Sequence, residues 1–187
     1  REPGRGEPRC LIEADVAVFC LGPKGDRQVD VRGYRRTYLG SLACLKQLLP
    51  KLPTLGQIVY TSSCSVYGDA DGEWVDETTP AQPHDDHGTV LLEAEHLLEG
   101  IAATPSKQVC ILRLGALHGP GRDLDQRFRG LSGQHRAGDG QRFTNWVHVA
   151  DAAGAVRASI EKGWSGVVNV VNDEPIRLAD LLDGGLS

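Results

Sequence analysis

The chain has 187 residues, enough for one domain with a sizeable hydrophobic core. Its net charge of −5, with no basic block, argues against nucleic acid and anionic membranes as partners. No apolar run approaches the roughly 18 residues of a membrane span. The five cysteines are scattered and mostly lie in apolar runs, which is typical of reduced thiols in a cytoplasmic protein rather than of disulfides or a metal site.

Hydrophobic patterning predicts strands and helices in alternation. A strand over residues 14–21 ends at Gly22-Pro23, and a helix follows from about residue 32 to residue 49. The next strand, at 57–64, begins with Ile-Val-Tyr and continues into small hydroxylated residues. Further along we expect helices over 88–102 and 150–161, strands over 108–114 and 167–171, and short helical segments near 123–131 and from about 178. This order predicts an α/β fold with a parallel sheet and flanking helices.

Ser62 and Ser63 come where the strand at 57–64 ends. In an open parallel sheet, ligands bind at the carboxyl ends of the strands, so these hydroxyl groups are candidates for contact with a ligand. Serines are also common in turns, where they satisfy backbone groups. Both interpretations remain open on the sequence.

Several short segments of the chain, taken in order, form a set of motifs that hydrophobic periodicity alone does not explain. They are residues 59–68 (Val-Tyr-Thr-Ser-Ser-Cys-Ser-Val-Tyr-Gly), 73–77 (Glu-Trp-Val-Asp-Glu), 92–95 (Leu-Glu-Ala-Glu), 112–114 (Leu-Arg-Leu), 119–121 (Gly-Pro-Gly), 148–151 (His-Val-Ala-Asp) and 169–173 (Asn-Val-Val-Asn-Asp). With them the chain resembles the NAD-dependent epimerase/dehydratase group of the extended short-chain dehydrogenases/reductases, and within it the atypical YeeZ-like branch. The resemblance implies a Rossmann-type doubly wound sheet, NAD or NADP as cofactor, and a nucleotide sugar or similar small metabolite as substrate.

One departure from this family concerns the cofactor. Its members open with a strand, a glycine-rich turn and a helix that hold the dinucleotide pyrophosphate. No Gly-x-x-Gly-x-x-Gly follows a strand in this chain, and Gly4 and Gly6 lie in a proline-rich segment. The resemblance therefore implies a single, partial Rossmann-type domain over residues 1–187 that begins at the family's fourth strand. We expect such a chain to bind NAD or NADP weakly or not at all, and to self-associate through an uncovered edge strand at 14–21.

A second departure concerns the catalytic group, which in the family is a Ser or Thr together with Tyr-x-x-x-Lys. Aligned on the motifs, the hydroxyl position falls on Ser63, the tyrosine position on His87 and the lysine position on Leu91. A histidine is a competent general base at neutral pH, and one of the two aspartates before His87 would orient it. The alternative is a solvent-facing histidine at the start of a helix.

The carboxyl ends of the strands at 14–21, 57–64 and 108–115 are expected to converge on one cleft. The catalytic candidates there are Ser63 and His87, and the cofactor-binding candidates are Gly22, Pro23, Ser62, Tyr67, Leu117 and His118. No histidine has partners at metal-ligand spacing, so no metal site is expected.

Some charged residues admit two interpretations. The acidic residues at 73–77 are interpreted as a solvated loop, and Arg142 either meets an anionic substrate or lies exposed on the surface.

For the protein as a whole, the first hypothesis is an epimerase/dehydratase-like enzyme that lacks the Tyr–Lys pair. The alternative is a non-catalytic dinucleotide- or metabolite-binding sensor or scaffold of the same fold.

Overall fold

The computed structural model describes residues 12–23, 30–104, 106–122 and 140–182. Its elements in chain order are β1 (Val16–Phe19), α2 (Val31–Leu48), η1 (Leu49–Lys51), β2 (Gln57–Ser63), η2 (Cys64–Tyr67), α3 (Asp86–Ala102), β3 (Gln108–Leu114), β4 (Ala116–His118), β5 (Phe143–Thr144), β6 (Trp146–His148), α5 (Val149–Glu161), β7 (Gly166–Val170), β8 (Ile176–Arg177) and α6 (Leu178–Leu182). The helical segment expected near residues 123–131 lies outside the described residues.

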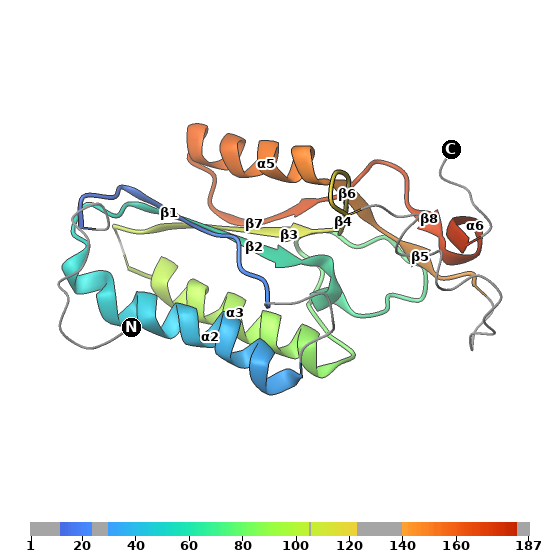
Figure 1. The fold of residues 1–187 in the computed structure, drawn as a ribbon, viewed down its shortest axis with the longest axis horizontal. Helices are drawn as coiled ribbons and strands as arrows, with labels where there is room; N and C mark the ends of the chain where they lie inside the picture. Colours follow the sequence, from blue (N-terminus) through green and yellow to red (C-terminus); the bar gives the residue numbers. More distant parts are fainter. Residues whose placement is uncertain (1–11, 24–29, 105, 123–139, 183–187) are drawn as a thin grey trace.

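The main sheet has the strand order β1-β2-β3-β7, and all its neighbouring strands are parallel. Helices α2 and α3 cover one face of this sheet, and α5 covers the other (Figure 1). Two short sheets, β4-β6 and β5-β8, lie beyond it toward the carboxyl ends of the strands. The α/β fold with a parallel sheet and flanking helices is thus confirmed.

The expected elements are present, with bounds shifted by one or two residues. Strand β1 is shorter than the expected range 14–21. Helix α3 begins earlier than expected because the carboxylate of Asp85 accepts a hydrogen bond of 2.7 Å from the backbone N–H of Gly88. Asp30 caps α2 in the same way, through the N–H of Gly33 at 2.7 Å. Such caps satisfy backbone donors that the first turn of a helix leaves free.

Two hydrophobic clusters lie on the two faces of the sheet, and β2 contributes to both. Ile58 and Tyr60 pack with residues of α2 and α3, whereas Val59 packs on the other face with residues of β3 and α5. All three side chains are 0% exposed. A parallel strand covered on both faces explains why the segment reads as a continuous apolar run.

Strand β1 pairs with β2 and with no other described strand, although the family fold that the sequence resembles places this strand inside the sheet. Val18, in the middle of β1, is 42% exposed. An unpaired edge offers backbone N–H and C=O groups to another chain.

We therefore expect the purified chain to self-associate as its concentration rises. Val18→Lys places a charge on the edge strand and should raise the monomer fraction, because charged edge residues oppose strand pairing between molecules. Light scattering after size exclusion measures the mass. Trp74→Lys is the control, since it removes exposed apolar surface in a loop away from β1. A constant monomer mass over a wide concentration range would contradict the expectation.

Candidate functional site

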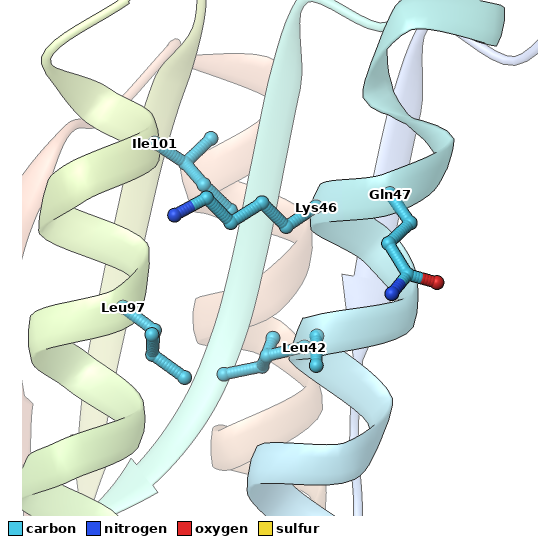
Figure 2. Close-up of a pocket in the computed structure, with 6 residues that line it drawn as sticks. Leu42, Lys46, Gln47, Leu97 and Ile101 are labelled. Carbon is cyan, nitrogen blue, oxygen red and sulfur yellow. The ribbon is translucent and has the colours of Figure 1, made fainter.

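An apolar groove of about 330 Å³ lies between α2 and α3 (Figure 2). It is lined by Leu42, Ala43, Lys46, Gln47, Leu97 and Ile101. These residues belong to the second halves of the two helices, which run back toward the amino ends of the strands. The groove is therefore separate from the edge of the sheet at which a ligand was expected.

The carboxyl ends of β2, β3 and β7 lie side by side. The parallel register aligns Ser63 with Leu114 and Leu114 with Val170. Gly115 alone separates β3 from β4, and a Cβ added there would lie 3.0 Å from the carbonyl oxygen of Asn145. A larger residue at position 115 would therefore be in tight contact with the segment before β6. The start of β4 and the ends of three main strands thus lie in the same region.

The two neighbouring serines have different surroundings. Ser62 is buried, and its hydroxyl donates a hydrogen bond of 2.5 Å to Oε1 of Glu95 in α3. Ser63 is half-buried, and its Oγ accepts a hydrogen bond of 3.2 Å from the backbone N–H of Ser65, which caps η2. Ser63 thus has the turn role that the sequence left open, and its hydroxyl donates to no acceptor among the described residues. The proposed ligand contacts of both serines stay predictions.

His87 and Leu91 occupy successive turns of α3 and lie in different environments. The half-buried His87 ring meets the ring of Tyr34 edge to face, with centroids 4.5 Å apart. Leu91 is 3% exposed and packs in the cluster between the sheet and α2. Position 91, which was expected to correspond to the family's lysine, is therefore a core position in this chain. Asp85, one of the two aspartates expected to orient His87, instead caps the helix.

The remaining cofactor-binding candidates follow other strands. Gly22 and Pro23 come after β1, and a Cβ added at Gly22 would meet no atom within 4 Å. Leu117 packs against the cluster beneath α5. His118 pairs in register with His148 of β6, with ring centroids 5.2 Å apart. These residues are near strand ends, as expected, and their contact with a cofactor stays a prediction.

Tyr67, the last cofactor-binding candidate, is buried at the end of η2. Its hydroxyl donates a hydrogen bond of 2.9 Å to Oδ1 of Asn169 in β7. The guanidinium of Arg113 lies over its ring, 4.6 Å from the centroid, as in a cation–π contact. Tyr67 is therefore held on its face and at its hydroxyl by the protein itself.

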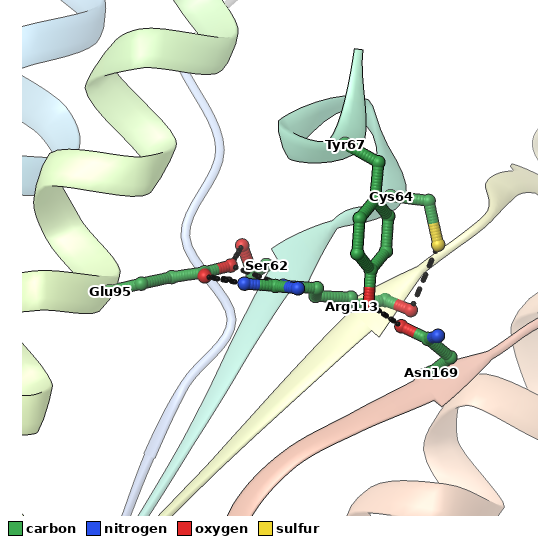
Figure 3. A network of polar contacts seen from close by, with 6 residues as sticks. All are labelled: Ser62, Cys64, Tyr67, Glu95, Arg113 and Asn169. Carbon is green, nitrogen blue, oxygen red and sulfur yellow. Dashed lines mark hydrogen bonds and ion pairs between the residues drawn. The ribbon is translucent and has the colours of Figure 1, made fainter. Parts of the chain in front are cut away.

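A buried ion pair supports this arrangement (Figure 3). Nη2 of Arg113 lies 2.7 Å from Oε2 of Glu95, and the two side chains are 6% and 1% exposed. Glu95 also accepts the hydroxyl hydrogen of Ser62, so the carboxylate is bonded from β2 and from β3. A buried charge is tolerated when it is paired and hydrogen-bonded in this way.

Sequence reasoning assigned no role to Glu95 or Arg113, although a signal was present. Glu95 follows Leu91 by four positions and therefore lies on the same apolar face of α3. Arg113 interrupts an otherwise apolar strand that is covered on both faces. Charged residues at core-facing positions are seldom fully buried unless they are paired, so the two positions together indicated an internal ion pair.

Cys64, which follows Ser63, is not an activated thiol. Its Sγ donates a hydrogen bond of 3.3 Å to the carbonyl oxygen of Arg113. Burial raises the pKa of this thiol to about 11. The thiolate form that would act as a nucleophile is therefore disfavoured at neutral pH.

The loop that follows η2 returns to the sheet at Glu77. Gly68, with φ of 74°, begins this loop, and a Cβ there would lie 2.0 Å from the carbonyl oxygen of Gln82. Glu77 is exposed, yet its Oε1 accepts a hydrogen bond of 2.8 Å from the backbone N–H of Asn169. Glu77 is thus exposed, as the interpretation of residues 73–77 as a solvated loop expects, and it also ties the loop to β7.

The described residues do not fit a complete dinucleotide site. Leu91, at the position expected to correspond to the family's lysine, is a core residue, and the hydroxyl of Ser62 is bonded to Glu95. The sequence also has no glycine-rich turn of the pyrophosphate-binding type. In the part of the chain that the structure describes, no three His, Cys, Asp or Glu side chains gather as metal ligands, and no helix is long and apolar enough to cross a membrane.

Comparison with known proteins supplies the family. The model of the NAD dependent epimerase/dehydratase family matches residues 34–171. Protein YeeZ of Escherichia coli K12 is 45% identical over 148 residues, which are 78% of this chain and 48% of YeeZ. The 3-diazoavenalumate denitrifying reductase of a Streptomyces species is 36% identical over 99 residues, 50% of this chain and 32% of that protein.

A solved structure of MoeE5 in complex with UDP-glucose and NAD superposes with a TM-score of 0.75 at 25% identity, and the match covers 93% of this chain and 62% of the MoeE5 chain. This chain spans about half the length of YeeZ. The family match covers most of the described sheet, from α2 to the end of β7. The chain belongs to the NAD-dependent epimerase/dehydratase family.

Proposed function

We propose that this chain forms the substrate-binding side of an epimerase/dehydratase-like protein that acts on a nucleotide sugar or a similar small metabolite. In this proposal, His87 stands at the tyrosine position of the family's Tyr-x-x-x-Lys as the candidate base, and Leu91 at the lysine position takes no part in proton transfer. The burial of Leu91 carries the proposal, because a core leucine can neither bind ribose hydroxyls nor lower the pKa of a neighbouring acid.

Ser63 and His87 are the polar groups proposed for the substrate. They belong to segments in contact, since a Cβ added at Gly88 would lie 3.3 Å from the carbonyl oxygen of Ser65. Ser63 keeps a hydroxyl hydrogen to donate, and the His87 imidazole lies in the first turn of α3. A hydroxyl donor at the end of β2 and an imidazole at the start of α3 suit a substrate that carries hydroxyl or carbonyl oxygens.

The relatives support a nucleotide sugar as the first choice of substrate and other small metabolites as the second. The MoeE5 structure contains UDP-glucose together with NAD, which favours a nucleotide sugar. The Streptomyces relative is named for a reductase of a different small molecule. The proposal therefore names the nucleotide sugar first and extends to other small metabolites. NAD or NADP is the cofactor proposed for the family's complete fold.

The second candidate function is a non-catalytic metabolite-binding sensor or scaffold. The core position of Leu91 favours it, because no amine is then present at the position expected for the family's lysine. In that case the chain would bind a metabolite at the carboxyl edge of the sheet without converting it.

Calorimetric titration of UDP-glucose into the purified chain tests the binding that both candidates share. We expect a dissociation constant between about 1 μM and 1 mM, or roughly −8.2 to −4.1 kcal/mol. A chimera that places the amino-terminal half of YeeZ before this chain then separates the candidates through hydride transfer to NAD. Turnover that falls at least tenfold in Ser63→Ala supports the enzyme, and binding without turnover supports the sensor. No binding of UDP-glucose by either protein would contradict the proposal.

A further inference from the structure

Asn169 lies at the carboxyl end of β7 with its amide held in one orientation. Its Oδ1 accepts the hydroxyl hydrogen of Tyr67 at 2.9 Å, and its backbone N–H donates to Oε1 of Glu77 at 2.8 Å. The residue is half-buried, and within the described ranges no residue accepts a hydrogen bond from its Nδ2. Since Tyr67 takes the amide oxygen, the two N–H donors of the amide are left for another partner.

The support behind this amide is rigid. Tyr67 lies beneath the guanidinium of Arg113, and Arg113 is paired with Glu95 in the core (Figure 3). The three side chains are buried and come from η2, β3 and α3. A polar group whose supporting residues are locked by packing and hydrogen bonds is pre-organised for binding.

The register places the side chain of Asn169 on the face of the sheet that α3 covers, the helix that carries His87. Asn169 pairs in register with Arg113, and Arg113 with Ser62, and the side chains of both partners meet Glu95 of α3. Neighbouring strands lie about 4.8 Å apart, so the two-strand step from β2 to β7 at this level is about 10 Å.

We propose that Asn169 is a substrate-binding residue whose Nδ2 donates a hydrogen bond to an oxygen of the sugar, and that Tyr67 is the positioning residue that fixes the amide. The inference rests on the function proposed above. The carboxylate of Glu77 beside Asn169 disfavours the diphosphate group at this point, because like charges repel. A neutral oxygen of the sugar is therefore the acceptor.

The test is calorimetric titration of UDP-glucose and of UDP into the purified chain and its variants. Asn169→Asp keeps the shape and the acceptor for Tyr67 but loses both donors. It should raise the dissociation constant of UDP-glucose at least tenfold and leave that of UDP within twofold. Asn172→Asp makes the same change at an exposed neighbour and should leave both constants unchanged. Asn169→Ser is the second variant if the aspartate does not fold.

Tyr67→Phe tests the positioning role through coupling. It should weaken UDP-glucose binding in the wild-type background and have no further effect in Asn169→Asp, because the amide it fixes is then absent. A purely structural role would give the same loss in both backgrounds. Wild-type affinity for UDP-glucose in Asn169→Asp, or an equal loss for UDP and UDP-glucose, overturns the inference and leaves the proposed function in place. A wild-type chain that binds neither ligand overturns both.

Discussion

Replacing Arg113 by methionine is expected to lower the free energy of unfolding by about 3 to 5 kcal/mol, the range observed when one partner of a buried ion pair is removed. The variant leaves the carboxylate of Glu95 in the core, where the side chain is 1% exposed, without its cation. Its other partner, the hydroxyl of Ser62, provides one neutral hydrogen bond and does not balance the charge. Urea denaturation of the variant and the wild type measures the loss.

Two variants make this experiment specific. Arg157→Met removes the same kind of side chain from an exposed pair with Glu161 and should leave the unfolding midpoint unchanged. Glu95→Leu combined with Arg113→Met removes both charges and should recover much of the loss, because apolar replacements of a whole buried pair are often tolerated. An Arg113→Met variant as stable as wild type would contradict the structural role of the pair.

Substituting Leu91 is expected to lower the free energy of unfolding by a similar amount. Leu91→Ala should cost about 2 to 5 kcal/mol, because it opens a cavity in the cluster between the sheet and α2. Leu91→Lys, which introduces the residue expected from the family motif, should cost at least as much, because it places an ammonium group in an apolar core. Leu97→Ala is the matched control on the same helix and should cost less, since Leu97 is 36% exposed.

The result for Leu91→Lys separates two accounts of α3. If position 91 is a core position in this chain, the lysine variant unfolds at lower urea concentration than wild type. If the lysine variant is as stable as wild type, its amine reaches solvent at the carboxyl edge. Position 91 would then be open to the family's role.

Much of the fold followed from local patterns because these patterns are the physical causes of the elements. In α3 the capping residue Asp85 and the apolar stripe through Val90, Ala94 and Leu98 are adjacent in sequence and sufficient for a helix. In β2 the apolar run reports burial on both faces. Strands as short as β4 and β6 have no such pattern, and they form because their chains are brought into register by the larger fold.

The site was less predictable because its contacts join residues that are distant in sequence. Ser62 and Ser63 are neighbours with the same chemistry, yet successive residues of a strand point to opposite faces. Ser62 meets Glu95, 33 positions later, and this contact cannot be derived from the motif that contains the serine. The tie between Glu77 and Asn169 spans 92 positions and depends on how a loop returns to the sheet.

The measurement that tests the central claim most directly is calorimetric titration of NAD, and of NADP, into the purified chain. Leu91, at the position expected to correspond to the family's lysine, is a core residue, and the sequence has no glycine-rich turn of the pyrophosphate-binding type. We therefore predict binding weaker than a dissociation constant of about 1 μM, or about −8.2 kcal/mol, for both dinucleotides. A dissociation constant below about 1 μM for either dinucleotide would show a cofactor site in this chain and contradict the account.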